Sequence, residues 1–547
     1  MNSKCASIGL VTNHSARGWR VEAGQSDTSC RGILKGPTSI NFVTNPQSKM
    51  AITNGDMFMS RASRAFASFI SVKTAKGRSS PFVPVAVVLG ALFMAWPAFY
   101  SGFPLMYPDT AGYVAAGRPV AAAILLHHRS FFYGKRSLIY SLGILPFHWG
   151  VTVWPIIALQ CLLTSFVLWL VFRSISPGKT SINFLILMFL LTLLTTLSWN
   201  GAFVMPDILG PDLYLCVFLL VFARDTLSRV ERLALYLISW WAIVSHATHL
   251  MTVIALCCSL ALLALFRPVP FRKHLRIAGE LTAIIALAAG AQIALNTLLY
   301  GKPSLNGTRP PFLTARLIAD GPGRWYLEKN CAELKWEMCN YVDNLSGSTN
   351  RFLWNADGVW MGATLDSQKR ILREEMPFTM AVLRTYPREQ LYQSAANFLM
   401  QLITFDLDDF GPNSDIYSDL QFHEALPKAR LRYLESRQSR NEMPLRLFNS
   451  IHHGVVIASL VGIATLLPWL WRRRPPRLVG LSLVIACSVV ANSLFAGTLS
   501  MVAGRFECRV IWLIPLFAGL CVFQLTAKRK AAKQNCTLAS RAFSEIQ

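Results

Sequence analysis

Charged residues are scarce in this sequence, and several motifs of soluble proteins are missing. Only 15% of the 547 residues are Asp, Glu, Lys or Arg, whereas a soluble chain usually carries about a quarter. The 12 cysteines include no Cys-x-x-Cys pair and no Cys/His array at zinc spacing, which excludes a metal-finger domain. A glycine-rich phosphate loop with a parallel-sheet pattern is also missing, which excludes a soluble nucleotide-sugar enzyme.

The charges that are present lie in short runs between long apolar stretches. Lys and Arg number 53 against 29 Asp and Glu, a net charge of +24. Because these cations do not form one continuous basic face, the pattern favours membrane topology over nucleic-acid binding. We therefore expect no nucleic-acid partner.

Ten apolar stretches are candidate membrane spans, because a bilayer core of about 30 Å needs about 20 apolar residues in a helix. The two stretches between 233 and 266 are interpreted as a hairpin that turns at 245–249. The predicted fold is an all-α polytopic membrane protein with about ten transmembrane helices and an outer-side domain of mixed or helical structure. The expected spans are 81–100, 151–172, 181–199, 208–223, 233–245, 250–266, 277–300, 451–471, 478–496 and 510–526.

Lys and Arg are concentrated in every second segment between the spans, and therefore on one side of the membrane, as the positive-inside rule requires. Basic residues follow the second, fourth, sixth, eighth and tenth spans, and the turns at 200–206 and 246–249 contain none. Both chain ends are therefore predicted to be cytoplasmic. The basic residues are Arg173, Lys179, Arg224, Arg229, Arg232, Arg267, Arg272, Lys273, Arg276, Arg472, Arg473, Arg474, Arg477, Lys528, Arg529, Lys530 and Lys533.

This topology divides the chain into five parts. Residues 1–80 are polar and lack the apolar core of a signal peptide, so we predict a disordered, basic cytoplasmic tail, and 527–547 form a second basic tail. A seven-span module covers 81–300 and includes a first outer loop at 101–136. An outer domain follows at 301–450, and three spans complete the membrane part at 451–526.

The outer domain contains two cysteines, Cys331 and Cys339, which are candidates for a disulfide if the outer side is oxidising. On a continuous helix eight residues rise about 12 Å, beyond the limit of about 7 Å for bridged Cα atoms. A bridge therefore requires the chain to turn between them.

Two carboxylates lie where the chain leaves the membrane on the outer side. Asp109 follows the first span in the stretch Tyr-Pro-Asp-Thr-Ala-Gly-Tyr, and Asp207 precedes the fourth span in Met-Pro-Asp. Ionisable groups at span ends are costly and are frequently functional. Each carboxylate has a second interpretation as a helix cap, and both interpretations stay open at this point.

Cations and histidines share the same outer face. His246 and His249 are three residues apart, as on one helix face, and suit either a polar turn or a ligand site. Arg505 and Arg509 begin the last span on the side where the charge bias disfavours cations, which indicates anion binding or a salt bridge to Asp109 or Glu507. Arg129 lies in the first outer loop. It is a further candidate for anion binding, or its side chain extends to the lipid headgroups instead.

These motifs, in this order, resemble the GT-C superfamily of membrane glycosyltransferases, which includes the oligosaccharyltransferase catalytic subunit, protein O-mannosyltransferases and lipid A aminoarabinose transferases. The stretch from Tyr107 to Tyr113 is similar to the Pro-Asp-Ser-x-x-Tyr type of many bacterial members. Met-Pro-Asp at Asp207 and Gly-Arg-Phe-Glu-Cys-Arg at 504–509 are similar in place and type. The resemblance covers 81–526.

The resemblance implies a multi-pass protein of the bacterial inner membrane that transfers a sugar from a polyprenyl-phosphate donor to a glycan, lipid or protein acceptor on the outer face. It implies catalytic roles for Asp109 and Asp207, and substrate binding by a second group of residues. That group comprises Tyr113, Arg129, His246, His249, Arg505 and Arg509.

The chain departs from metal-dependent GT-C members, because its second outer loop has Asp207 alone and no Asp-x-Asp. No metal ligand is assigned for this reason, and a divalent metal cofactor stays open. Two other functional classes fit a ten-span chain: a transporter or lipid flippase, and a non-enzymatic scaffold for envelope assembly. Transporters usually show internal repeats, and the seven-plus-three division here shows none.

Overall fold

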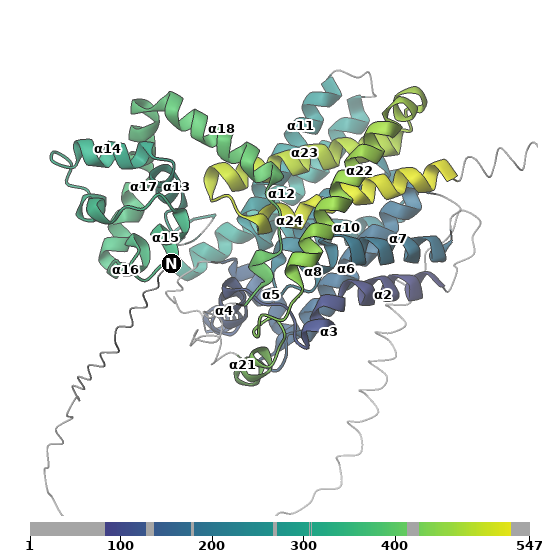
Figure 1. Ribbon diagram of the computed structural model, residues 1–547, viewed down its shortest axis with the longest axis horizontal. Helices are drawn as coiled ribbons and strands as arrows, with labels where there is room; N and C mark the ends of the chain where they lie inside the picture. Colours follow the sequence, from purple (N-terminus) through teal and green to yellow (C-terminus); the bar gives the residue numbers. More distant parts are fainter. Residues whose placement is uncertain are drawn as a thin grey trace, which may run out of the picture. The chain divides into compact units, whose positions relative to one another are not determined.

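The computed structural model describes residues 82–126, 136–176, 180–265, 271–305, 307, 309–412 and 426–526 (Figure 1). The two predicted tails, 1–80 and 527–547, lie outside these residues, and so does Arg129. The described part is all-helical, as predicted, and its one β-type contact is an isolated parallel bridge between Leu105 and Phe203.

The helices fall into three consecutive groups. The N-terminal group comprises α2 (Phe82–Met94), α3 (Trp96–Ser101), α4 (Pro108–Leu125), α5 (Leu138–His148), α6 (Trp154–Ile175), α7 (Ser181–Leu194), α8 (Leu197–Gly201), η2 (Pro206–Ile208), α9 (Leu209–Phe222), η3 (Arg224–Thr226), α10 (Arg229–Ser245), α11 (Ala247–Leu265) and α12 (Phe271–Tyr300). The outer-domain group comprises α13 (Phe312–Ala319), α14 (Pro322–Asn330), η4 (Glu337–Asn344), α15 (Thr349–Trp354), α16 (Val359–Gly362), α17 (Leu365–Thr385), α18 (Pro387–Ile403), η5 (Asp408–Phe410) and α21 (Pro427–Leu434). The C-terminal group comprises α22 (Leu445–Arg473), α23 (Pro476–Leu499) and α24 (Gly504–Ile511), after which helical structure continues to Thr526.

Within the described residues, five helices are long and apolar enough to cross a membrane, which indicates an integral membrane protein. The five helices are Trp154–Ile175, Arg276–Tyr300, Leu445–Arg473, Pro476–Leu499 and Gly504–Thr526. Four further apolar helices are shorter, namely Phe82–Met94, Leu138–His148, Ser181–Leu194 and Ala247–Leu263. The count of ten spans stays a prediction.

Two of the expected spans are broken into shorter helices. Helix α2 ends at Met94 and α3 restarts at Trp96, where Pro97 occupies the second helical position and cannot donate a hydrogen bond to the preceding turn. Helix α7 ends at Leu194 because Thr195 adopts an extended backbone, with φ of −134°. Hydropathy alone does not register such breaks, since both halves remain apolar.

The segment between the first two expected spans contains two helices. Helix α4 accounts for 18 residues of the first outer loop, and α5 follows that loop at 138–148, where no element was predicted. Ser137 begins α5 as its N-cap by accepting a hydrogen bond from Tyr140 N at 3.2 Å. The two helices pack closely because Gly117 has no side chain: a Cβ there would lie 2.7 Å from Ser141 O.

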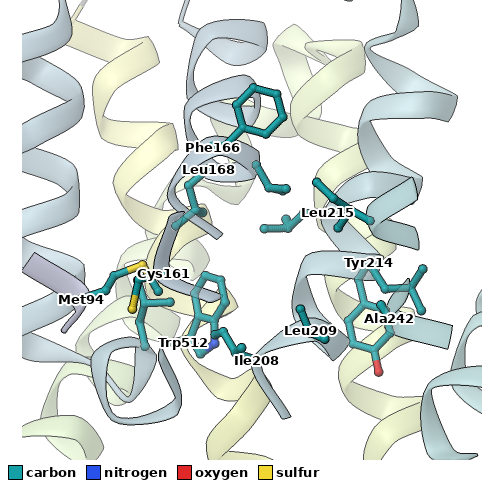
Figure 2. Packing of buried hydrophobic residues seen from close by; sticks show 14 of the residues in the cluster. Met94, Cys161, Phe166, Leu168, Ile208, Leu209, Tyr214, Leu215, Ala242 and Trp512 are labelled. Carbon is teal, nitrogen blue, oxygen red and sulfur yellow. The ribbon is translucent and has the colours of Figure 1, made fainter. Parts of the chain in front are cut away.

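Most buried apolar side chains of the membrane part belong to one large core, of which Figure 2 shows a portion from close by. Met94 of α2 and Cys161 of α6 lie beside Trp512, and Leu209 of α9 lies nearby. All four side chains are at most 1% exposed. The indole Nε1 of Trp512 donates to Arg509 O at 2.8 Å, so this large ring is buried without an unsatisfied donor. The packing of Trp512 holds the C-terminal end of α24 against α6 and α9.

The outer domain has a separate core and a disulfide. Buried apolar side chains from α13, α15, α16 and α17 form this core, including Phe352, Trp360 and Phe378. Cys331 and Cys339 are bonded with their Cα atoms 5.4 Å apart, and α14 ends at Asn330 so that the chain turns between them, as the spacing required. The location of this domain on the outer side of the membrane stays a prediction.

Cysteine labelling from the outer side tests the orientation of the membrane part. We expect a membrane-impermeant maleimide to react with Asp357→Cys, since this side chain is 62% exposed in the outer domain. The reagent should spare Arg474→Cys, at the basic end of α22, until the membrane is permeabilised. Labelling of Arg474→Cys in intact cells would contradict the topology.

Candidate functional site

The two outer segments that carry Asp109 and Asp207 lie side by side. Leu105 N donates to Ala202 O at 3.0 Å, and Val204 N donates to Leu105 O at 2.9 Å. The hydroxyl of Thr110 then donates to Val204 O at 3.0 Å. Residues almost 100 positions apart are therefore joined by backbone hydrogen bonds, and both acidic motifs belong to one structural unit.

Neither carboxylate acts as the helix cap considered in the sequence analysis. Tyr107 is the N-cap of α4, Pro108 begins the helix, and Asp109 lies in its first turn. Asp207 lies within η2, and the N-cap of α9 is Ile208, which has no side-chain cap. Each carboxylate still interacts favourably with the positive end of the helix dipole, because it lies in or next to the first turn. This interaction does not depend on a capping hydrogen bond.

A cavity of about 1950 Å³ opens between the outer ends of the membrane helices and the outer domain. Its lining includes five of the predicted site residues: Asp109, Tyr113, His246, Arg505 and Arg509. Asp207 and His249 do not line it. The structure therefore brings together most of the residues selected from sequence, and it places these two behind the wall of the cavity.

Asp109 is held between two guanidinium groups in this cavity. Its Oδ1 forms a salt bridge with Arg136, and its Oδ2 lies 3.9 Å from Arg505 Nη1. The guanidinium of Arg136 also lies over the ring of Trp354, 5.8 Å from its centroid, so it connects α4 to the outer domain. The Asp109 side chain is 14% exposed, enough to meet a bound molecule.

Arg505 is buried and has unused hydrogen-bonding capacity toward the cavity. Its side chain is 10% exposed, and among the described residues its Nε and Nη1 have no hydrogen-bond partner. Its nearest carboxylates are Asp109 at 3.9 Å and Asp409 at 4.0 Å, and it lies over the Tyr107 ring at 4.0 Å. A buried donor without a partner costs about 1–3 kcal/mol, and a bound anion would remove that cost.

Two neighbours of Arg505 outside the membrane-spanning helices have shifted pKa values. Burial raises the pKa of Tyr107, with the Arg505 charge acting in the opposite direction. Burial also raises the pKa of the Asp409 carboxyl, again opposed by Arg505. A raised pKa favours the protonated, neutral form of both groups.

Asp207 and Arg509 belong to a polar network beneath the cavity. Arg509 Nη1 lies 3.4 Å from Asp207 Oδ1, and its Nε and Nη2 donate to Asn492 Oδ1 at 2.9 and 2.7 Å. Asn492 Nδ2 donates in turn to Glu507 Oε2 at 3.0 Å. Because these bonds hold its guanidinium, Arg509 presents a fixed positive charge to the cavity wall and Asp207 neutralises part of it.

The two histidines occupy different environments. His246 is the C-cap of α10, outside any helix, and its Nδ1 is 2.8 Å from Thr248 Oγ1. His249 lies in α11, with Nδ1 2.8 Å from Ala242 O. The chain turns at His246, as the polar-turn interpretation has it, and the centroids of the two imidazole rings are 5.3 Å apart.

Tyr113 forms part of the cavity wall, where its ring packs edge-on against Tyr140 with 4.9 Å between the ring centroids.

Sequence reasoning did not select two residues that complete the site. Arg136 was one of several loop cations, and Asp409 lies far along the outer domain in the stretch Asp-Leu-Asp-Asp at 406–409. That acidic stretch was the available signal. Within the part of the chain that the structure describes, no group of three or more His, Cys, Asp or Glu side chains is placed to hold a metal ion.

The described residues thus form an all-helical membrane protein with a large cavity lined by charged side chains. No protein-family model, curated protein or solved structure matches the chain. The argument for function therefore rests on the chemistry of the cavity.

Proposed function

We propose that this protein is a membrane glycosyltransferase that uses a polyprenyl-phosphate sugar as donor and acts on the outer face of the membrane. One observation carries the proposal: the Asp109 carboxylate and the buried Arg505 guanidinium line the same cavity 3.9 Å apart, and two Arg505 nitrogens have no hydrogen-bond partner among the described residues. The resemblance of the outer motifs to GT-C enzymes supports the same assignment. The acceptor is a glycan, lipid or protein, and the compartment is the bacterial cell envelope.

Asp109 and Arg505 have separate roles in the proposed reaction. Transfer breaks the bond between the anomeric carbon of the sugar and a phosphate oxygen, and forms a bond between that carbon and the acceptor oxygen. Asp109, as general base, accepts the proton of the acceptor hydroxyl. Arg505 stabilises the negative charge that develops on the leaving phosphate, through N–H groups that are already oriented and desolvated.

The remaining side chains set the electrostatics of the cavity. Arg136 binds Oδ1 of Asp109 and so directs Oδ2 toward Arg505. Arg509, held by Asn492 and Asp207, adds positive charge at the wall. An anionic donor is favoured in such a site, because buried cations attract an anion more strongly than cations in water.

A comparison of membrane glycans and glycolipids in cells with and without the gene tests the proposal. We expect one sugar substituent to be missing in the deletion strain and to return when the wild-type gene is restored, but not when Asp109→Asn is supplied. The two rival classes, a transporter or flippase and an assembly scaffold, predict that Asp109→Asn restores the wild-type pattern. Unchanged glycans in the deletion strain would refute the glycosyltransferase assignment.

A further inference from the structure

Helix α18, the long helix at the end of the outer domain, exposes an apolar face to its surroundings. The exposed side chains recur every three or four residues, so they lie on one side of the helix. Tyr392 and Ile403 are 72% and 69% exposed. We call this surface the α18 apolar face; its residues are Leu391, Tyr392, Ala395, Ala396, Leu399, Met400 and Ile403.

The opposite side of α18 packs against α23, one of the five long apolar helices. The approach is close at Gly497, where a Cβ would lie 2.6 Å from Asn397 O. Gln401 is hydrogen-bonded to Ala503 in both directions, at 3.0 and 2.9 Å. Figure 1 shows the C-terminal part of α18 beside α23 and the start of α24. The helix is therefore level with the outer ends of candidate membrane spans.

Contacts at both ends prevent α18 from turning its apolar face inward. Toward the N-terminal end, Asp320 accepts hydrogen bonds from Gln390 and Asn397, each at 2.8 Å. Beyond the C-terminal end, the ring of Phe405 stacks on His453 of α22 at 4.2 Å between centroids. The exposed orientation of the face is thus built into the fold.

We infer that the α18 apolar face lies in the outer leaflet of the lipid bilayer, so that lipid covers it and anchors the outer domain. The sequence contains no charged residue from 390 to 405, a length of helix that would carry charges if it faced water. Charges return at Arg388 and Glu389 at one end and at Asp406 at the other, as expected at the headgroup level.

Lipid is favoured over a second copy of the chain because the apolar surface extends onto the membrane part. Helix α23, on which α18 packs, exposes Val490 and Leu494, at 46% and 41%. A span must present such side chains to acyl chains. Because α18 is fixed beside α23 at the same level, its apolar face meets acyl chains as well. This inference does not depend on the proposed enzymatic activity.

Photocrosslinking of the full chain tests the inference. The protein is reconstituted in phosphatidylcholine and phosphatidylglycerol vesicles that contain phosphatidylcholine with a diazirine in its acyl chain, irradiated and digested for mass spectrometry. We expect label on the peptide with residues 391–403 and on the α22 peptide with Ile457 and Leu460, which are 61% and 50% exposed. The peptide with Met376 and Met380, exposed apolar residues of α17 that do not line the cavity, should stay unlabelled.

Label on α22 but not on α18 would overturn the inference, whether water or a second copy covers the face. Equal label on α18 and on the Met376 peptide would overturn it as well. A matched pair of variants adds an independent measurement, since Leu399 of α18 and Met376 of α17 are 59% and 55% exposed and both lie inside a helix. In vesicles, Leu399→Asp should lower the melting temperature by at least about 3 °C relative to Met376→Asp, because a charge is costly in lipid and not in water; equal melting temperatures would contradict a lipid-covered face.

Discussion

Asp109→Asn is expected to lower sugar transfer by about a hundredfold or more, while the protein accumulates in the membrane at its normal level. Asparagine has the same size, and its side-chain oxygen can still accept the hydrogen bonds of Arg136 at the Oδ1 position. What it lacks is the basic oxygen that takes the acceptor proton. The measurement is the rate of transfer from a polyprenyl-phosphate sugar in isolated membranes, together with the amount of protein present.

The matched control is Asp357→Asn, which alters an Asp–Arg pair of the outer domain: Asp357 lies 3.0 Å from Arg351, outside the cavity lining. We expect this control to transfer sugar at nearly the wild-type rate. Because Tyr107 and not Asp109 is the N-cap of α4, loss of a cap cannot account for a large effect at Asp109. Near-normal transfer by Asp109→Asn would rule out its role as the base.

Arg505→Ala is expected to lower the rate of sugar transfer at low donor concentration by about tenfold to a hundredfold. This factor corresponds to the loss of one charge-assisted hydrogen bond, which contributes about 1.5–3 kcal/mol. The alanine variant removes the buried N–H groups that face the cavity. Arg505→Lys keeps the charge but not the planar fork that binds two phosphate oxygens, so it should retain part of the activity. Transfer is measured against donor concentration, and the melting temperature of each variant reports on folding.

Arg477→Ala is the control for this series, since Arg477 lies at the opposite end of α23 and makes its own contacts. It donates to Ser174 O at 2.8 Å and forms a salt bridge with Asp225. Its loss should leave the affinity for the donor unchanged. If Arg505→Ala and Arg477→Ala had equal, small effects on transfer, Arg505 would not be a phosphate ligand.

Several features of this protein follow from local sequence. Long apolar runs without charges predict helices that suit a membrane, because backbone hydrogen bonds can be satisfied there only within a helix or a closed barrel. The polar residues at 245–249 predict a break between two helices, and the structure has this break, with α10 ending at Ser245 and α11 beginning at Ala247. The turn required between Cys331 and Cys339 is likewise present. Each of these depends on residues that are near neighbours in the chain.

The break between α2 and α3 and the extra helix α5 show where local patterns were insufficient. Both halves of the first expected span are apolar, so hydropathy joined them, although Pro97 interrupts the hydrogen bonding. Helix α5 is short, and its stability comes from packing on α4 at Gly117. Helix boundaries of this kind depend on contacts that a hydropathy profile does not contain.

Hydropathy and charge pattern predict an all-helical chain with apolar helices, and they single out Asp109, Arg505 and Arg509 as candidate site residues. Which of these groups meet depends on the folded chain. The fold brings Asp109 within 3.9 Å of Arg505, places Asp409 beside the same guanidinium, and pairs Asp207 with Arg509. Sequence patterns could not predict these pairs, because hydropathy and capping act over a few residues, whereas the paired groups are separated by about a hundred to four hundred positions in the chain.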